Sequence, residues 1–571
     1  MESSDNSTRG SLSRRRFLGA SAAAGLWMSV GRLAAEADPT APQDFPPTVE
    51  LYREQFQNWD GAISTDPLWT CAPRTQDEVV AVVNWAHTHQ YRVRASGHRH
   101  SWSPLTVVDG QADAVLLVDT TRNLTALSVV STAPAAVRAQ TGASMESLLT
   151  FLEDNGYGVT ATPAAGDITV GGVLAVDGHG SAVPASGEAR MPGHTYGSLS
   201  NLVTSLTAVV WDAAAGRYVA RTFDRAEPDC AAFLTHVGRA FLTEVTLRVG
   251  ANYNLRCVTR TDVPASDLFA PTEGPRSLSG FLDESGRVGV IWFAFTDNPW
   301  MQIWTVTPHR PFLSRPVFGP YNYPFADNLP QPVADLAARI VKGETALAPI
   351  YGQLQYTATV AGLTATLARD MWGPSKNFLL YVRPTTMRVT AGSYAIHTSR
   401  GELQHVLSEF VAEYQGLLAQ YRARGLFPIN GGVEIRVTGL DHAADVGVPG
   451  AQPPALSAVR PREDHPEWDV AVWLDVITFP DTPGSHAFYR DLEDFFHRTY
   501  TGSRATARVE WSKRWGHTEA GAWTDQTTIT QRIPDSFRQG PSPTWDRAVA
   551  TLNSYDPDRV FGNPLLDVLL R

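Results

Sequence analysis

The stretch Ser96-Gly97-His98-Arg99-His100-Ser101 follows a predicted strand over residues 91–95, and it decides the fold together with two later stretches. These are Gly166-Asp167-Ile168-Thr169-Val170-Gly171-Gly172-Val173 and Asp177-Gly178-His179-Gly180. Glycine lets a backbone approach a ligand closely, and successive N–H groups in such turns form a cradle for an anion such as a pyrophosphate. Each stretch alone is also typical of a plain connection, so their order along the chain carries the information.

Helices and strands alternate around these turns. Thr75-Gln76-Asp77-Glu78 has the pattern of a capping box, and valines at helical spacing follow it, which predicts a helix over residues 76–89. A second helix is predicted over 145–155, and strands over 114–118, 136–140 and 157–161. This mixture indicates one domain over residues 45–252.

From residue 253 the pattern changes to one typical of an antiparallel sheet backed by helices. We predict strands over 288–295, 302–307, 378–382 and 387–390, and a helix over 403–422. The second domain is expected over residues 253–540. Residues 541–571 form a separate C-terminal segment, for which a return to the first domain is one option. The predicted fold class is therefore α+β, with two domains.

Composition excludes several classes of protein. The 571 residues are 43% hydrophobic and 18% charged, which argues against intrinsic disorder. The formal net charge of -11 gives no general electrostatic footprint for nucleic acid or anionic lipid. Three cysteines cannot all pair and none lies in a CxxC motif, so disulfides are not expected to hold the fold together.

The N-terminus resembles a targeting segment. Ser13-Arg14-Arg15-Arg16-Phe17-Leu18-Gly19 precedes an uncharged stretch that is too short to span a bilayer, and Ala35-Glu36-Ala37 suits a peptidase. We predict that residues 1–37 are a twin-arginine signal peptide, with the export machinery as a partner and a periplasmic or secreted product. The alternative is a basic helix that stays on the protein. Twin-arginine export favours proteins that fold around a cofactor before they leave the cell.

Several common motifs are missing after this segment. The chain has no GxGxxG between a strand and a helix, no GxxxxGK[ST], no HExxH and no GxSxG. Rossmann-type nucleotide binding, P-loop hydrolysis, zincin chemistry and the usual serine hydrolase site therefore lose support.

The order of the remaining motifs resembles the FAD domain of the vanillyl-alcohol-oxidase (FAD PCMH-type) superfamily. The three glycine-rich stretches are followed by Tyr196-Gly197-Ser198-Leu199-Ser200-Asn201 and by residues 239–248. Residues 319–325, 375–378 and 434–439 are similar to the substrate domain of the covalent-flavin cholesterol oxidase branch. The resemblance covers nearly all of the chain beyond the signal segment, and it implies the two-domain fold of that superfamily.

This resemblance implies FAD as the cofactor. The contacts it assigns come from the glycine-rich stretches, a strand and a segment near the C-terminus: Ser96, Gly97, His98, Arg99, His100, Ser101, Asp167, Gly171, Gly172, Gly178, His179, Gly180, Val245 and Lys513. Lys513 is equally compatible with a surface position.

A histidine of the first stretch carries the flavin 8α-methyl carbon in this family. Relatives have a Gly-x-x-His-Ser order, which His100 fits, so we predict the covalent link there. His98 as the link, and noncovalent FAD, stay open as alternatives. A metal at His98-x-His100 is not expected, because no further ligand lies nearby in the sequence.

Glu434 and Arg436 are the expected catalytic pair. Residues i and i+2 of a strand point to one face, and the resemblance places this Glu-x-Arg beside the flavin. Glu434 is expected to act as general base and Arg436 to orient it and stabilise charge; an exposed ion pair without function is the alternative. Many relatives carry an acid where this chain has Gly289, and Asp297 and Asp475 are possible substitutes. Asp475 is therefore included among the catalytic residues.

The resemblance implies an FAD-dependent alcohol oxidase that takes a hydride from a 3β-hydroxysterol and passes electrons to O2, with Δ5 to Δ4 isomerisation as an optional second step. One alternative is an oxidase or dehydrogenase of sugar alcohols, lactones or other bulky alcohols. Another is a noncatalytic flavin- or sterol-binding protein. The sequence gives no indication of which protein, if any, is a stable partner. Aromatic residues between 292 and 325 are expected either to line a sterol-sized cavity or to belong to the core.

Overall fold

The computed structural model describes residues 41–112, 114–323, 329–540 and 544–571. The predicted signal peptide, residues 1–37, lies outside the described residues. The chain divides into Met1–Phe45 and Pro46–Arg571. The described residues 41–45 of the first unit contain no helix or strand. All elements named below belong to the second unit.

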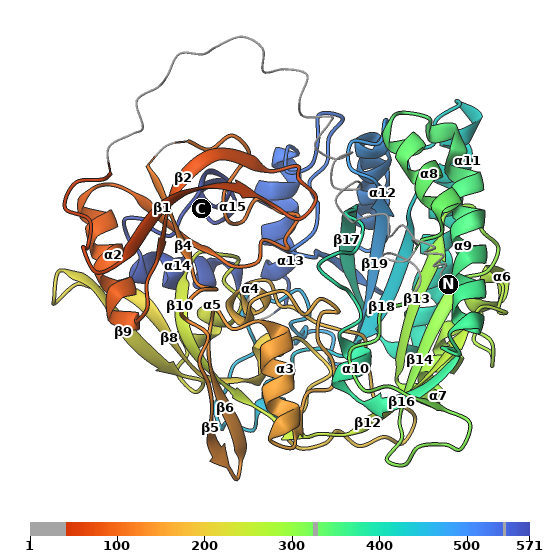
Figure 1. Cartoon of the computed structure of the whole chain (residues 1–571), viewed down its shortest axis with the longest axis horizontal. Coiled ribbons are helices and arrows are strands. Elements are labelled where there is room, and N and C mark those ends of the chain that lie inside the picture. Colours follow the sequence, from red (N-terminus) through yellow and green to blue (C-terminus); the bar gives the residue numbers. More distant parts are fainter. Residues whose placement is uncertain (1–40, 113, 324–328, 541–543) are drawn as a thin grey trace, which may run out of the picture. The chain divides into compact units, whose positions relative to one another are not determined.

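The N-terminal half of this unit contains two main sheets (Figure 1). The first has the order β1-β2-β4-β3: β1 Glu50–Gln57, β2 Ser64–Ala72, β3 Arg92–Ser96 and β4 Val115–Asp119. The second has the order β5-β6-β10-β8-β9: β5 Leu127–Thr132, β6 Ala135–Gln140, β8 Val203–Asp212, β9 Arg217–Asp224 and β10 Phe241–Arg248. A short pair joins β7 Tyr157–Gly158 to β11 Gly250–Ala251.

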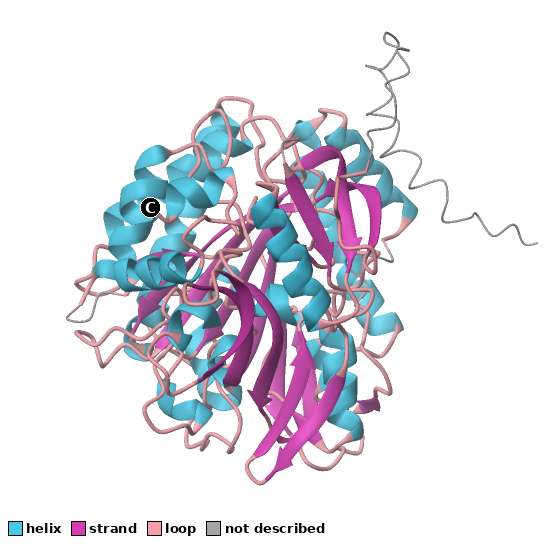
Figure 2. Cartoon of the chain, turned by 90° about the vertical axis from the view of Figure 1, so that its left-hand side faces the viewer, coloured by secondary structure: helices cyan, strands magenta, loops and turns pink. Residues whose placement is uncertain are grey.

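Helices flank these strands (Figure 2). They are α2 Gln76–Thr88, α3 Met145–Asp154, α4 Val170–Ala175 and α5 Cys230–Leu234. The Thr75 side chain accepts a hydrogen bond from the backbone N–H of Glu78 and caps α2. Val79, Val82 and Val83 are buried in α2. The valines that predicted this helix by their spacing therefore form the face that packs against the rest of the domain.

A sheet of nine strands forms the C-terminal half, in the order β15-β16-β12-β14-β13-β18-β19-β17-β20. Its strands are β12 Asn254–Arg260, β13 Arg287–Phe293, β14 Trp300–Val306, β15 Arg315–Pro316, β16 Asp370–Pro374, β17 Thr390–Thr398, β18 Gly432–Thr438, β19 Val470–Thr478 and β20 Thr506–Val509. Neighbouring strands are antiparallel except for β15 and β16.

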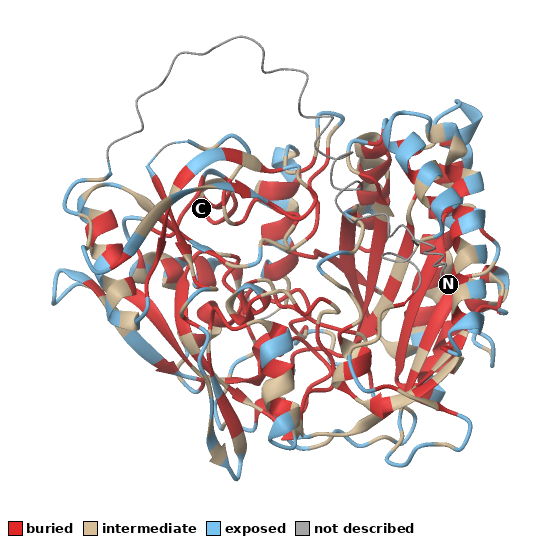
Figure 3. Cartoon of the chain, viewed as in Figure 1, coloured by how far each residue is buried: buried red, intermediate tan, exposed pale blue. Residues whose placement is uncertain are grey.

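One face of this sheet is backed by helices, whose outer sides are exposed while the central strands are buried (Figure 3). The helices of this half are α6 Ala265–Leu268, α7 Leu278–Ser285, α8 Gln331–Val341, α9 Ala348–Ala365, α10 Lys376–Leu379, α11 Leu403–Ala423, α12 Ser485–Thr499 and α13 Ile533–Arg538. Every residue of β17 is buried, because both faces of the sheet are covered there. The predicted α+β class is confirmed.

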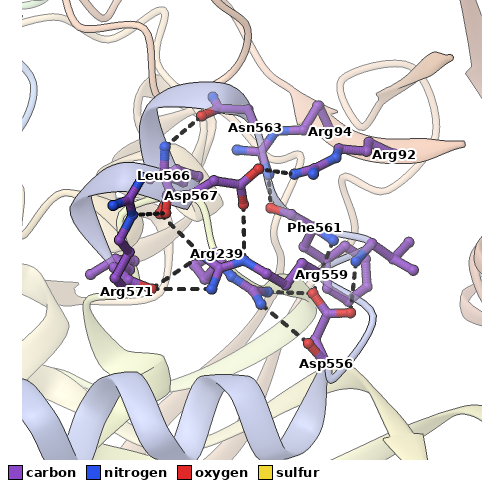
Figure 4. Close-up of polar contacts among 12 residues, drawn as sticks. Arg92, Arg94, Arg239, Asp556, Arg559, Phe561, Asn563, Leu566, Asp567 and Arg571 are labelled. Carbon is purple, nitrogen blue, oxygen red and sulfur yellow. Dashed lines mark hydrogen bonds and ion pairs between the residues drawn. The ribbon is translucent and has the colours of Figure 1, made fainter. Parts of the chain in front are cut away.

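The C-terminal segment lies against the first sheet. It contains α14 Trp545–Tyr555 and α15 Pro564–Leu569. The backbone N–H of Val93 in β3 donates to the carbonyl of Val560 at 2.8 Å. Figure 4 shows the polar contacts around it, in which the buried Arg239 pairs with Asp556 and Arg559 pairs with Asp567.

Four local predictions were wrong. Residues 378–382 are not a strand, because Phe378 and Leu379 belong to α10 and Val382 forms only an isolated bridge with Ala165. Residues 387–389 are a loop that leads into β17, which begins at Thr390. The strand predicted over 157–161 is limited to β7. The stretch that ends at Val173 is not a turn throughout, because its second half begins α4.

Cys71, Cys230 and Cys257 are buried free thiols. Within the described ranges, no helix is both long enough and apolar enough to cross a bilayer.

Candidate active site

A cavity of about 380 Å³ is lined both by the glycine-rich stretches and by one face of the nine-stranded sheet. The N-terminal half contributes residues 97–102, together with Gly171, Gly172, Gly178 and His179. The sheet contributes Ile291, Phe293, Glu434 and Arg436, α9 contributes Tyr351 and Gln355, and the segment after β20 contributes Glu510, Ser512 and Lys513. Residues far apart in the sequence thus surround one space.

The first wall is the turn that follows β3. Arg99 has a left-handed backbone with φ of 60°, which is uncommon for a residue other than glycine. Its guanidinium donates to Glu54 at 2.6 Å and to the carbonyl of Gln55 at 3.0 Å, so it holds the turn onto β1. Among the described residues, none accepts a hydrogen bond from the backbone N–H groups of residues 97–101. These donors are therefore available to an anionic ligand.

Close packing explains the glycine in this turn. A Cβ atom added to Gly97 would lie 2.5 Å from Oγ1 of Thr169, the residue that caps α4. The turn and α4 consequently approach each other more closely than two ordinary residues allow.

His98 and His100 both line the cavity, but His98 is exposed and His100 is only partly exposed. The His100 ring stacks on Trp59 at 3.9 Å between centroids, and its Nδ1 lies 4.0 Å from Oδ1 of Asp167. Neither atom has a hydrogen-bond partner among the described residues, although both are buried. Burial, followed by the charge of Lys513, lowers the pKa of His100 to about 3, so the imidazole is neutral at pH 7.

His179 joins the two halves. Its ring stacks on Trp473 of β19 at 3.6 Å, and its Nε2 lies 3.8 Å from Oε1 of Glu510. Burial is the main cause that lowers the pKa of His179. The preceding Gly178 is required by packing, because an added Cβ would come within 2.5 Å of Val173 Cγ1.

Strand register places Glu434 and Arg436 on the cavity side. On β18, Glu434 lies opposite Asp475 of β19 and Ile291 of β13. Arg436 lies two residues further, so its side chain leaves the same face of the strand. Both side chains are only partly buried and line the cavity, whereas Asp475 is fully buried and does not line it.

These residues form a compact charged cluster. Arg436 pairs with Asp475 and, at 3.4 Å, with Glu510. The Lys513 ammonium lies 3.4 Å from Asp475 and 4.0 Å from the Trp102 ring centroid. Asp475 also accepts a hydrogen bond from Ser393 of β17. The cluster thus contains three carboxyl groups and two cations. The carboxyl groups are Glu434, Asp475 and Glu510, and the cations are Arg436 and Lys513. This excess of carboxyl groups favours protonation of one of them.

The carboxylates differ in their affinity for that proton. Burial is the main cause that raises the pKa of Glu434, and the charges of Asp475 and Glu510 act in the same direction against Arg436 and Lys513. For Glu510, burial alone would raise the pKa, but Lys513 and Arg436 outweigh it and hold the pKa well below its usual range. Because its pKa is raised while that of Glu510 is lowered, Glu434 is the better placed of these two carboxylates to take up a proton.

Some predicted site residues do not line the cavity: Ser96, Asp167, Gly180, Val245 and Asp475. Val245 packs in the core of the N-terminal half. Asp167 lies next to His100, and Asp475 pairs with Arg436, so these two carboxyl groups contact residues that line the cavity. Asp297 lies on an exposed loop, outside the cavity lining.

Gly289, the position at which the family resemblance led us to expect an acid, lies opposite Arg436. A Cβ added there would come within 3.0 Å of Cη2 of Trp304, so this indole occupies the space of the missing side chain. Of the two substitutes considered, Asp475 is the one that contacts Arg436.

Sequence reasoning missed Glu510, Trp59 and the two α9 residues Tyr351 and Gln355 as lining residues. Glu510 begins the segment that contains Lys513, so its charge next to a predicted flavin contact was an available signal. Trp59 and the α9 residues carry no local motif, because tertiary packing alone brings them to the cavity.

The residues present fit FAD. Free backbone N–H groups in the turn after β3 suit a pyrophosphate, and the adjoining space extends to the charged cluster of the sheet. Bound FAD supplies a hydride acceptor at such a site. The sheet side of the cavity provides a carboxyl group, Glu434, that can accept the proton of an alcohol, and two cations, Arg436 and Lys513, that can stabilise negative charge.

Comparison with known proteins agrees with this geometry. The FAD binding domain model matches residues 67–214, and the model described as cholesterol oxidase, substrate-binding, matches residues 254–571. The chain belongs to the cholesterol oxidase family. This membership confirms the predicted family and a two-domain flavoenzyme, an FAD-dependent oxidoreductase that acts on CH–OH donors.

Solved structures of this family are similar over most of the chain. A solvent-stable cholesterol oxidase is 51% identical, with a TM-score of 0.91 over 93% of this chain and 100% of that one. Cholesterol oxidase from Brevibacterium sterolicum is 44% identical, with a TM-score of 0.91 over 94% and 100%. D-arabinono-1,4-lactone oxidase from Candida glabrata is 27% identical over 157 residues, a match that spans 27% of either chain.

Proposed function

We propose that this cholesterol oxidase family member oxidises a 3β-hydroxysterol to the ketone with O2 as electron acceptor. The observation that carries the proposal is the position of Glu434, a partly buried carboxyl with a raised pKa, in a cavity that also contains the glycine-rich cradle. Two relatives named as cholesterol oxidases share 44% and 51% of their residues with the chain.

Glu434 is the proposed general base. As the carboxylate, it takes the proton of the substrate hydroxyl while the carbinol hydrogen leaves as a hydride toward the flavin, and the alcohol carbon becomes the ketone. A raised pKa makes this carboxylate a stronger base than an exposed one. When bound, FAD would accept the hydride, and O2 would take up the two electrons with two protons to give hydrogen peroxide.

Arg436 and Lys513 stabilise negative charge during this step. Both cations lie next to Glu434 in the charged cluster, and both contact Asp475. Asp475 is thereby a positioning residue: it holds the two cations at the sheet and leaves Glu434 free to face the cavity. Glu510 also contacts the Arg436 guanidinium, at 3.4 Å.

His100 is the proposed point of covalent attachment to FAD. A nucleophilic imidazole has to be neutral, and burial keeps His100 in that form. Acid denaturation should leave the flavin with the precipitated polypeptide in the wild type and in His98→Ala, and release it from His100→Ala. Flavin released from the wild type would contradict the assignment.

We extend the proposal to isomerisation of a Δ5 sterol. After oxidation, Glu434 would first release the hydroxyl proton, which is one of the two that O2 takes up to form peroxide. Its carboxylate would then remove a proton beside the new ketone and return it at the far end of the double bond, which conserves atoms and charge. The conjugated product absorbs strongly in the ultraviolet where the unconjugated ketone does not, so peroxide formation without this absorbance would restrict the enzyme to oxidation.

The proposal includes export, because the N-terminal arginines and the apolar stretch after them suit the twin-arginine route. Replacement of Arg14 and Arg15 by Lys should retain the protein inside the cell. Unchanged export would remove this part of the proposal.

A substrate panel tests the proposed function. Hydrogen peroxide is recorded with detergent-solubilised 3β-hydroxysterols and with sugar alcohols, for the wild type, Glu434→Gln and the matched control Asp297→Asn. We expect peroxide from sterols with the wild type and the control, and a loss of at least about a hundredfold in kcat with Glu434→Gln. Peroxide from sugar alcohols alone would overturn the substrate class, and full activity of Glu434→Gln would overturn the base.

A further inference from the structure

Helix α9 provides a second polar position in the cavity, away from the charged cluster. Tyr351 and Gln355 are the residues of this helix that line the cavity. They are four residues apart, so they lie one turn from each other on the same face of the helix. The mechanism proposed for Glu434 uses neither side chain.

The hydroxyl of Tyr351 is buried without a polar partner. The residue is fully buried, and its hydroxyl has no hydrogen-bond partner among the described residues. Burial alone raises the pKa of this hydroxyl, so it stays protonated at neutral pH and can donate a hydrogen bond. Buried hydroxyl groups of native proteins are in large majority hydrogen-bonded. Because Tyr351 lines the cavity, a ligand held in the cavity can supply the missing acceptor.

Close packing fixes the position of Tyr351. A Cβ atom added to Gly352, the next residue of α9, would lie 2.1 Å from the carbonyl oxygen of Ala294, so the helix is pressed against the end of β13. The Tyr351 ring packs on Phe479 at 5.6 Å between centroids. Phe479 is itself held by its backbone N–H, which donates to the Asn430 side chain at 2.9 Å.

The strand register gives the distance of this position from the catalytic carboxyl group. Asp475 lies opposite Glu434, and Phe479 follows Asp475 by four residues. Since a strand advances by ~3.3 Å per residue, Phe479 lies ~13 Å along the sheet from Glu434. On the other side of β18, Ile291 lies opposite Glu434, and Ala294 is ~10 Å further along in the same direction. These distances are of the same order as the length of a fused four-ring nucleus.

The sheet face between the two positions is apolar. The side chains that line the cavity along this face are Ile291, Phe293, Ile477 and Phe479. Gly431 and Gly432 also line it and leave room, because they carry no side chain. A flat apolar ring system therefore fits between Glu434 and Tyr351, with one polar group of the protein at each end.

We infer that Tyr351 binds an oxygen substituent at the end of the steroid opposite the 3β-hydroxyl, so that the preferred substrates are 3β-hydroxysteroids with a ring-D ketone. This inference rests on the proposed function, which places the 3β-hydroxyl at Glu434. The Tyr351 hydroxyl donates its hydrogen bond to the ketone oxygen. A site of this kind discriminates against an analogue without the oxygen, because the buried polar group of the protein is then left unpaired.

Ligand titration tests the inference. Androst-4-ene-3,17-dione has the ring-D ketone and androst-4-en-3-one lacks it, and neither has a 3-hydroxyl that could reduce the flavin. The Kd of each is measured on the FAD-loaded protein from the change in flavin absorbance, for the wild type, Tyr351→Phe and the control Tyr356→Phe. The control removes a hydroxyl of the same helix that donates to the carbonyl of Thr261 at 2.7 Å and does not line the cavity. We expect the wild type and the control to bind the diketone at least about tenfold more tightly, and Tyr351→Phe to bind both ketones equally.

Turnover and stability provide two further readouts. With 3β-hydroxyandrost-5-en-17-one as substrate, Tyr351→Phe should raise KM at least about tenfold and leave kcat near the wild-type value, because the hydroxyl is remote from the reacting carbon. With androst-5-en-3β-ol, the three proteins should have equal KM values. Loss of an unpaired hydroxyl should not lower the urea midpoint of Tyr351→Phe, whereas Tyr356→Phe loses a hydrogen bond and should unfold at slightly lower urea.

The outcomes separate the inference from the proposed function. Equal affinity of the wild type for both ketones, or a preference for the diketone that Tyr351→Phe retains, would overturn the inference. So would a wild type that binds neither ketone. A preference that Tyr351→Phe loses, without peroxide from either 3β-hydroxysteroid, would overturn the proposed function and leave the role of Tyr351 standing. Peroxide from both 3β-hydroxysteroids with equal affinities for the two ketones would do the reverse.

Discussion

Replacement of Asp475 by Asn should move the acidic limb of the pH–rate profile to lower pH. Asp475 lies opposite Glu434 across two antiparallel strands and is fully buried. Its negative charge is one of the causes that raise the pKa of Glu434 above the ordinary value of 4.5. Because the base acts as a carboxylate, activity is lost as pH falls through this raised pKa.

The magnitude follows from the spacing of the strands. Directly opposite residues have Cβ atoms about 5 Å apart, and two charges at that distance repel by ~3 kcal/mol at an effective dielectric constant of about 20. Partial exposure of Glu434 reduces this value, so we expect a shift of about one to two pH units. Removal of Asp475 also frees Arg436 and Lys513 to interact with Glu434, which lowers its pKa further.

The assay is kcat/KM for a detergent-solubilised sterol as a function of pH, with flavin content measured for each protein. The plateau of kcat/KM at high pH should be lower in Asp475→Asn than in the wild type. Glu434 becomes a weaker base, and Arg436 loses the ion pair that holds it in place. Ser393→Ala keeps the charge of Asp475 and removes one hydrogen bond to it, so its acidic limb should stay near the wild-type position. An unchanged limb in Asp475→Asn, or a limb at higher pH, would refute the electrostatic reasoning.

Two predictions concern stability and cofactor content. Arg239→Ala leaves the buried Asp556 without its cation and should lower the free energy of unfolding by about 3–5 kcal/mol in urea titrations, whereas Arg339→Ala, in an exposed ion pair, should leave the midpoint unchanged. Equal midpoints would show that the C-terminal segment is not held by this pair. Gly178→Ala forces a Cβ against Val173 and should cost about 1–3 kcal/mol and reduce bound flavin; unaltered flavin content would contradict the packing argument.

The sequence predicted those parts of the site that local patterns encode. The glycine stretches mark places where backbone must come close to backbone, as Gly97 does beside Thr169. The i, i+2 spacing predicts that Glu434 and Arg436 share a face, and both line the cavity. The α+β fold follows from the change between alternating elements and a strand-rich second half.

The parts that could not be predicted depend on tertiary register. The position of Asp475 opposite Glu434 requires the pairing of β18 with β19, which are separated by a long connection. Glu510 reaches Arg436 only because the segment after β20 folds back toward β18. The helix α10 replaces a predicted strand because its polar groups bond to neighbouring loops, a contact that the local sequence does not encode.

We propose above all that Glu434 removes the hydroxyl proton of a sterol while a hydride passes from the sterol to the flavin. The most direct measurement is the anaerobic reduction of protein-bound flavin by a single addition of 3β-hydroxysterol, followed by visible absorbance in a stopped-flow instrument. The account predicts rapid bleaching in the wild type and Asp297→Asn, and bleaching at least about a hundredfold slower in Glu434→Gln with normal flavin content. Equal bleaching rates in all three proteins, or a flavin that sterol does not reduce, would contradict it.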